Sequence, residues 1–599
     1  MRRANAAGQD ERPKRDVAEP LDWSMRRRRI LNRWQARLAG LGPRARAFTS
    51  QPEPRTIGSF NRGRQLVAGN FLFAGYLVEA PETAIWDLPM PDEAFETEVH
   101  GFVWLDDLAA VGDRTARGRA QSWTHDWALR FGSGRGPGWE PDIVGRRLIR
   151  WLCHGVLLLN GKGGVEAKPF FQALSRQTNF LARRWRAADP GLPRFEALAG
   201  LVHAAISLGG MERYLGGATK ALARECATRI DAEGGIPSRN PEELLDVFVL
   251  LTWTMDVLGE NGHVPPPDLV SAVQRIAPTL RALRHADGGL ARFHGGGRGL
   301  DGRLDQALAA SGIRHMRHKG LSMGFARLSH GRTTVIIDAA QPPRTVHSLD
   351  AHASTLAFEL TSGRRPLIVN CGAGATFGSN WRRAGRATPS HSTLAIEGYS
   401  SSRLGGAGFV AGRRTELLID GPQDVTCQKR DDDHAVLVLS HDGYLGTHGL
   451  IHYRRLELGS DGRSLMGDDS LSALTPEAEA VFDRIFERTG GVGVPFAVRF
   501  HLHPDVHAEL DMGGAAVSMA LKSGEIWVFR HDGRAELTLA PSVYLERGRL
   551  GPRATKQIVL SAAAVDYGSR IGWTLAKAQD TPAHIRDHVT EDDLAAAER

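Results

Sequence analysis

The chain is poor in cysteine and has no long apolar run. Its four cysteines, Cys153, Cys226, Cys371 and Cys427, are widely separated and form no CxxC pair. This spacing excludes a disulfide framework and a zinc finger, and it is compatible with a reducing compartment. No stretch approaches the roughly 18 consecutive apolar residues of a membrane-spanning helix. We therefore expect no transmembrane segment.

An export signal is also lacking, because residues 1–22 are polar and charged and no apolar h-region follows the early arginines. This leaves a cytoplasmic location open. Residues 24–40 combine a basic run with apolar residues at helical spacing, which predicts a basic amphipathic helix. Such a helix either contacts a membrane surface or another anionic ligand, or is simply the solvated face of an ordinary helix.

The charge balance favours an anionic partner. The formal net charge is +7 and the pI is about 9.4. No nucleic-acid module is recognisable, because zinc-finger spacing, a basic region with heptads and an aromatic RNP-type strand are all missing. We therefore expect no nucleic-acid partner. An acidic polysaccharide or an anionic surface remains compatible with the charge.

The 599 residues exceed what one hydrophobic core accommodates, and the pattern divides the chain in two. Apolar spacing is mostly helical in the first half, with breaks at Gly and Pro that are typical of successive helix pairs. Short alternating runs separated by turns follow and predict an antiparallel β-sandwich. The predicted parts are a disordered stretch at 1–22, a helical domain at 23–310, a sandwich domain at 311–575 and a charged tail at 576–599.

A group of polar residues lies at the ends of predicted strands in the second half. Asp350 and His352 are two residues apart and would share one face of a strand. Asn370 ends the run LIV, and His391 opens the run STLAI. We expect these four side chains, which can bind metal, sugar or protons, to converge beside a set of arginines.

The segments HASTLAFEL, LIVNCG and RATPSHSTLAIEG, after a helical half, resemble the heparinase II/III family of polysaccharide lyases. The resemblance covers most of the chain, from about residue 139 to 574. It implies an α+β multidomain fold, with an incomplete (α/α) toroid followed by an antiparallel β-sandwich. It also implies β-elimination of uronic-acid-containing polysaccharides such as heparin, heparan sulfate or alginate, with no organic cofactor. Family lyases generally work outside the cytoplasm or in the cell envelope, so the resemblance implies that location.

β-Elimination requires a cation or donor that neutralises the substrate carboxylate, a base that removes the C5 proton and an acid for the leaving oxygen. The catalytic candidates are His352, His391, Asp350 and Tyr399. The substrate-binding candidates are Arg239, Asn240, Glu243, Trp381, Arg382 and Arg386. Structural roles are the alternative: Asn240 as a helix cap, Arg239 in a surface salt bridge, and Tyr399 as a strand-end aromatic.

The match to the family departs from its pattern at chemically important positions. Asp350 replaces the first histidine of the H-x-H-x-D motif, and no tyrosine lies near Glu243, where the family's catalytic tyrosine would fall. The sequence is therefore compatible with two functions. One is a lyase acting on an acidic polysaccharide. The other is a catalytically impaired carbohydrate-binding or envelope polysaccharide assembly protein.

A structural zinc ion is a further implication of the resemblance. In members with a metal, the second histidine, an aspartate and the later histidine hold it, and here these positions are His352, Asn370 and His391. A neutral amide is a poor substitute for a carboxylate, which Asp350 is placed to supply. Either the set holds zinc, or the two histidines hydrogen-bond within the sandwich.

Overall fold

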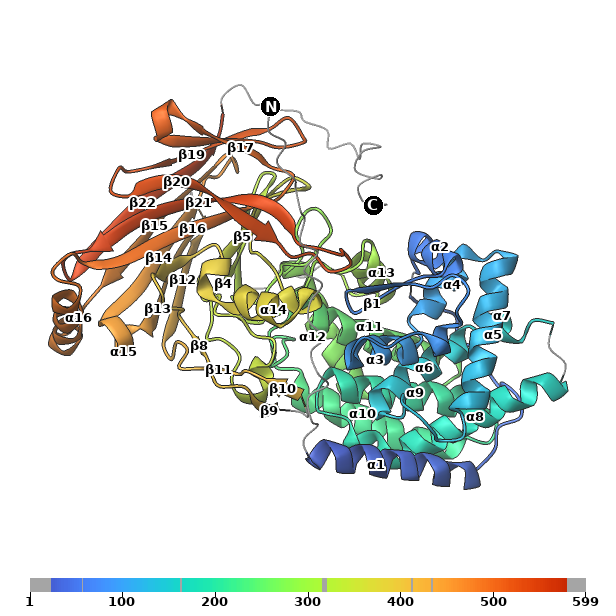
Figure 1. Cartoon of the computed structure of the whole chain (residues 1–599). Helices are drawn as coiled ribbons and strands as arrows, with labels where there is room; N and C mark the ends of the chain where they lie inside the picture. Colours follow the sequence, from blue (N-terminus) through green and yellow to red (C-terminus); the bar gives the residue numbers. More distant parts are fainter. Residues whose placement is uncertain are drawn as a thin grey trace, which may run out of the picture.

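The computed structural model describes residues 23–56, 58–161, 164–314, 320–410, 413–431 and 435–578. A helical half comes first and a sheet half second (Figure 1). The predicted disorder at 1–22 lies outside the described residues, as does the predicted tail beyond residue 578. The last strand continues to Lys577, so the start of the predicted tail belongs to a sheet.

The helical half consists of helices packed around an aromatic-rich core that includes the fully buried Trp104, Trp127 and Trp151. Close helix contacts depend on glycine: a Cβ on Gly200 would lie 2.5 Å from the Cα of Gly145 on the neighbouring helix. The helices are α1 (Trp23–Leu38), α2 (Phe60–Ala68), α3 (Glu93–Gly101), α4 (Trp104–Val111), α5 (Arg114–Arg130), α6 (Pro141–Cys153), α7 (Gly155–Leu159), α8 (Gly164–Arg184), α9 (Leu192–Ser207), α10 (Leu215–Arg229), α11 (Pro241–Glu260), α12 (Pro267–Ala282) and α13 (Arg303–Ala310).

The sheet half contains two large antiparallel sheets that share one apolar core. The first has the strand order β12 (Val425–Asp431), β13 (Ala435–Tyr444), β14 (Leu450–Leu458), β15 (Ser464–Ser472), β22 (Gly568–Lys577), β19 (Ile526–His531), β18 (Ala516–Ala520) and β17 (His507–Asp511). The second has the order β20 (Glu536–Tyr544), β21 (Arg553–Ala564), β16 (Val494–Leu502), β6 (Arg365–Val369), β5 (Phe358–Ser362), β4 (Thr333–Asp338) and β3 (Phe325–His330), and β7 (Leu394–Ile396) also pairs with β16.

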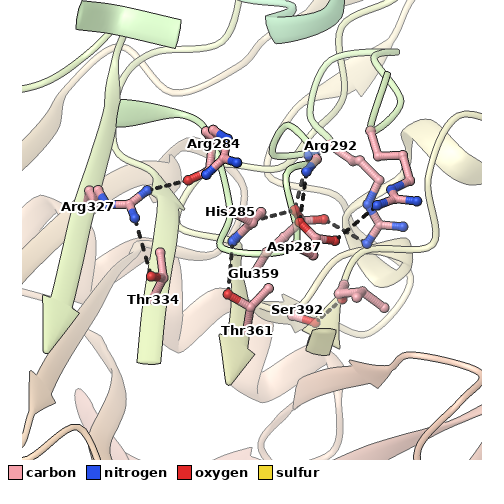
Figure 2. A network of polar contacts seen from close by, with 12 residues as sticks. Arg284, His285, Asp287, Arg292, Arg327, Thr334, Glu359, Thr361 and Ser392 are labelled. Carbon is pink, nitrogen blue, oxygen red and sulfur yellow. Dashed lines mark hydrogen bonds and ion pairs between the residues drawn. The ribbon is translucent and has the colours of Figure 1, made fainter. Parts of the chain in front are cut away.

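The two halves share apolar and charged contacts. The core of the helical half extends into the sheet half, and the rings of Phe293 and Phe325 lie 5.0 Å apart. Glu359 on β5 is buried and accepts hydrogen bonds from the side chain and the backbone N–H of Arg292, at 3.0 and 3.1 Å. His285 Nε2 lies 3.2 Å from the same carboxylate (Figure 2). The loop after α12 is thus fastened to the sheet.

Arg239, just before α11, makes the most extensive polar contact between the halves. Its Nε donates to the carbonyl of Met323, and its two terminal nitrogens donate to the carbonyls of Gly324, Ala340 and Gln341. The remaining donor meets Asp338 on β4 at 2.6 Å. All five N–H donors of the guanidinium are therefore used. The prediction of a substrate-binding Arg239 is wrong on this ground, and so is the alternative of a surface salt bridge.

We predict that Arg239→Met lowers the free energy of unfolding by roughly 3–5 kcal/mol, because it leaves the buried Asp338 carboxylate without its cation. Denaturant titration followed by far-ultraviolet circular dichroism measures this change. The matched control is Arg303→Met, which removes a partly exposed pair with Asp246. It is expected to cost less than about 1 kcal/mol. Equal losses in the two variants would contradict the assignment.

Candidate functional site

Two buried histidines from different segments meet at the edge of the sandwich. His352 lies in the loop between η5 (Thr345–Ser348) and β5, and His391 lies between η7 (Thr388–Ser390) and β7. His352 Nδ1 is 2.9 Å from His391 Nε2. His391 Nδ1 is 2.9 Å from the carbonyl O of Ala387, which only accepts, so Nδ1 carries the proton and Nε2 carries the lone pair. The donor in the pair is therefore His352 Nδ1.

A third histidine, His294, supports this pair and was not found from the sequence. Its Nδ1 accepts the backbone N–H of His352 at 3.2 Å, and its Nε2 lies 3.3 Å from Asp338. Ser354 Oγ donates to the same carboxylate at 2.7 Å. His294 has φ +47°, a strained value for a non-glycine residue. Neither His294 nor Asp338 stands in a motif that marks it, so only tertiary structure brings them to the site.

The histidine pair is electrically neutral at neutral pH. Burial lowers the pKa of His391 to about 4 and lowers the pKa of His352 well below its usual value. Burial alone would raise the pKa of Asp338, but Arg239 and His294 outweigh it and hold the pKa low. His352 Nε2 consequently carries a lone pair, and it has no hydrogen-bond partner among the described residues. That atom is the one basic nitrogen of the pair that is not already engaged.

Asn370, at the end of β6, lies beside the same segment. Its Oδ1 accepts the backbone N–H of Ser392, the residue after His391, at 3.0 Å. Its Nδ2 is buried and has no hydrogen-bond partner in the described part of the chain. Of the four residues expected to converge, His352 and His391 are in contact, and Asn370 is bonded to the backbone of the residue after His391.

The fourth residue, Asp350, is not part of this group. The segment from 349 to 357 forms turns and bends instead of a strand, so the expectation that Asp350 and His352 share a strand face is wrong. The side chain of Asp350 is 63% exposed and accepts from Arg382 at 3.0 Å, whereas His352 is buried. The carboxylate is therefore placed neither as a base at the pair nor as a ligand next to it.

The arginines near the pair hold the chain in place. Arg386, on α14 (Ser379–Arg386), is 2% exposed, and its three nitrogens donate to the carbonyls of Ala351, Glu416 and Ser348. Burial lowers its pKa to about 10. Arg386 is thus a structural residue, which corrects its predicted contact with a substrate. Trp381 and Arg382 on the same helix are half-buried, and Arg382 also donates to the carbonyl of Leu349.

The remaining candidates lie elsewhere. Asn240 is the N-cap of α11 and accepts from the backbone N–H groups of Glu242 and Glu243. Glu243 accepts from Ser238 Oγ at 2.6 Å, and burial raises its pKa. Tyr399 is 51% exposed and packs edge-on against His448, with ring centroids 4.5 Å apart. Asn240 therefore has the structural role of the alternative, and no contact joins Tyr399 to the histidine pair within the described residues.

Carboxylates gather where the N-terminus of α11 faces the sheet half. Glu242 accepts from Arg547, which comes from the loop after β20, at 3.1 Å. The charge of Glu242 is the main cause that raises the pKa of Arg547, and Asp246, Glu98 and Asp350 add to the rise. Burial raises the pKa of Glu196 to about 7, and the charges of Asp142 and Asp246 add to the rise. The carboxylates of Glu242, Asp246 and Asp350 are thus each paired with an arginine.

A zinc ion does not fit the donors that the structure provides. Two imidazole nitrogens are suitable ligands, but they already share a hydrogen bond. The Asn370 oxygen is engaged by Ser392, and the Asp350 carboxylate pairs with Arg382. Within the residues that the structure covers, no three His, Cys, Asp or Glu side chains form a group that could hold a metal ion.

Comparisons with known proteins agree with this architecture. The family described as "Heparinase II/III-like, C-terminal" matches residues 313–574. FtsZ-localized protein C of Caulobacter vibrioides (strain NA1000 / CB15N) is 32% identical over 549 residues, which cover 90% of this chain and 91% of that protein.

Solved structures show the same fold at low identity. A crystal structure of heparinase III has a TM-score of 0.64 at 13% identity and covers 92% of this chain and 89% of its own. A mutant of the heparan sulfate lyase HepC from Pedobacter heparinus has a TM-score of 0.58 at 14% identity, with coverage of 93% and 89%. The expected toroid followed by an antiparallel sandwich is confirmed. The matched sheet domain, the shared architecture and the full-length relative establish that the chain belongs to the heparinase II/III family.

Proposed function

We propose that this chain is a catalytically impaired member of its family that works by binding, at a site set by FtsZ, on a membrane surface. The proposal takes the second of the two functions carried forward from the sequence and replaces its carbohydrate or envelope partner with FtsZ and a lipid surface. A lyase acting on uronate polymers is the other, and the residues around the histidine pair argue against it.

The observation that carries the proposal is that Arg239 and Arg386 use their N–H groups for hydrogen bonds within the protein. A uronate lyase must neutralise the substrate carboxylate before the C5 proton becomes acidic. Arg239 has no donor left, and each nitrogen of Arg386 donates to a backbone carbonyl. Three further arginines near this junction are already paired with carboxylates: Arg547 with Glu242, Arg303 with Asp246 and Arg382 with Asp350.

The similarity to a protein of Caulobacter vibrioides supports the proposed localisation with FtsZ. The protein from Caulobacter vibrioides that aligns with nine-tenths of this chain is named for its localisation with FtsZ. We infer that this chain is positioned with FtsZ in the same way. Its toroid and sandwich then serve as a binding scaffold and do not cleave polysaccharide.

Helix α1 supplies a surface suited to lipid. Met25, Asn32 and Ala36 face the body, while Trp23 and Trp34 are 72% and 53% exposed. Ile30 lies seven residues after Trp23 and four before Trp34, so the three side chains share the outward face of the helix. The helix lies along the outside of the helical half (Figure 1).

Arginines flank this stripe. Four arginines of α1 are exposed: Arg26, Arg27, Arg33 and Arg37. Aromatic side chains beside arginines are the composition of an interfacial helix that binds anionic lipid. No helix of the described residues is long and apolar enough to span a bilayer. Peripheral contact through α1 is therefore the form of membrane association that we propose.

We predict that the chain produces no unsaturated uronate from heparan sulfate, alginate or hyaluronan. The measurement is ultraviolet absorbance of the carbon–carbon double bond that β-elimination creates. A rise in absorbance that His391→Ala abolishes would contradict the impaired-enzyme proposal, because it would require the histidine pair to transfer protons.

We predict that a fluorescent fusion of the chain co-localises with labelled FtsZ in the source bacterium and disperses when FtsZ is depleted. The control variant is Asp350→Asn, which removes the charge of an exposed carboxylate that the sequence suggested as a catalytic base. This variant is expected to keep the wild-type localisation. A diffuse signal in the presence of FtsZ would contradict the proposed location.

We predict that Trp23→Glu with Trp34→Glu weakens binding to vesicles that contain phosphatidylglycerol by about tenfold or more, a loss of at least roughly 1.4 kcal/mol. Co-sedimentation measures the bound fraction, and phosphatidylcholine vesicles show the dependence on lipid charge. Val492→Glu alters a side chain that is 75% exposed in the sandwich and serves as the matched control. Unchanged binding in the double variant would remove α1 from the proposal.

A further inference from the structure

A serine and a histidine meet at the outer strand of the second sheet. His501 lies on β16 and is 2% exposed, and Ser542 lies on β20 and is half-buried. Ser542 Oγ is 2.7 Å from His501 Nδ1. The other ring nitrogen, Nε2, lies 2.9 Å from the carbonyl O of Pro389, which can only accept. Nε2 therefore carries the proton, Nδ1 carries the lone pair, and the hydroxyl of Ser542 donates to it.

This arrangement contains the parts of an activated serine. The hydroxyl is the nucleophile, the imidazole is a base within hydrogen-bond reach, and the carbonyl of Pro389 fixes the tautomer and the direction of the ring. Burial lowers the pKa of His501 to about 4, so the imidazole is neutral at neutral pH. The backbone N–H of His501 also donates to Ser392 Oγ at 2.9 Å, which holds the residue in place.

Cys371 is a second nucleophile beside the pair, and its surroundings make it unreactive. Its sulfur lies 3.5 Å from His501 Nδ1 and 3.8 Å from Ser542 Oγ, but the residue is only 3% exposed. Burial raises the pKa of the thiol to about 11, although hydrogen bonds with the side chain of Ser542 and the backbone of Val543 act against it. Such a thiol is protonated at neutral pH and is a poor nucleophile. Ser542, the more exposed of the two residues, is left as the reactive group.

The backbone next to Ser542 offers a donor for the negative charge of a reacting ester. The N–H of Leu545 takes no part in pairing with β21 and donates to the carbonyl of Cys371 at 2.7 Å. Alternate N–H groups of a strand point the same way, so the N–H of Val543 lies on this side too, where it contacts the Cys371 sulfur. Sulfur is a weak acceptor, so this N–H can donate to a developing oxyanion instead. The N–H of the residue after the serine has this role in α/β-hydrolases.

We propose that Ser542 and His501 form a nucleophile–base pair that transfers acyl groups from carboxylic esters. Ser542 Oγ bonds to the acyl carbon while its proton passes to His501 Nδ1. The bond from the acyl carbon to the alcohol breaks, and the leaving oxygen takes the proton from His501. Water then attacks acyl-Ser542 by the same route, which releases the acid and returns the proton to Ser542. Because β20 is the outer strand of its sheet, an ester can approach Ser542 from the open edge.

The test treats the full-length protein with a fluorophosphonate probe, which phosphonylates an activated serine with loss of fluoride, and separately with p-nitrophenyl acetate. Peptide mass spectrometry is expected to find the fluorophosphonate adduct on Ser542. Release of p-nitrophenol should be faster with the wild type than with Ser542→Ala, which should also lose the adduct. His501→Gln should slow both reactions about a hundredfold or more, because it removes the base.

The matched control is Ser518→Ala, which alters a half-buried serine on β18 of the other sheet and should react like the wild type. Melting temperatures show which variants are folded. A wild type that fails either reaction, under conditions that fully label a known serine esterase, would overturn the proposal. An adduct that persists in Ser542→Ala, or that lies on Cys371, would overturn it as well. These outcomes need only the wild type and the loss of one hydroxyl, so they do not depend on the folding of His501→Gln.

Discussion

The contact between Arg239 and its five acceptors is the constraint on which the arrangement of the two halves depends. The guanidinium comes from the end of the toroid that begins α11, while all five acceptors belong to the first strands of the sandwich and the turns around them. Because Asp338 also faces His294 and Ser354, the same carboxylate joins the domain contact to the histidine pair. The site therefore cannot form unless the domains are docked.

Backbone strain is concentrated around this contact. Arg239, His294, Met323 and Leu356 all have positive φ, and none of them is glycine. Met323 accepts from Arg239, and Leu356 donates its backbone N–H to the carbonyl of Asp338. Such conformations persist only where surrounding contacts determine them. The strained residues are therefore held in place by the contacts between the two halves.

Sequence reasoning reached the architecture and the two central histidines, because apolar periodicity and motif resemblance are carried by local stretches of chain. It failed where side-chain position depends on the fold. Asp350 was expected on a strand, yet its segment turns before β5 begins, so that alternate residues do not share a face. His294 was missed because it approaches His352 from a loop of the other half. The role of Arg239 was missed because backbone carbonyls, its main partners, leave no trace in a sequence.

The way α1 is held has a mechanical consequence. Asn32, in the middle of the helix, donates to Glu140 and accepts from Arg184, each at 2.8 Å, and Arg28 pairs with Asp189. These contacts fix α1 rigidly on the surface of the toroid, so the helix does not move independently of it. A lipid surface bound by Trp23 and Trp34 would then fix the tilt of the whole molecule. The sandwich would project at an angle set by helix packing, so any partner it binds would be held at a defined height above the bilayer.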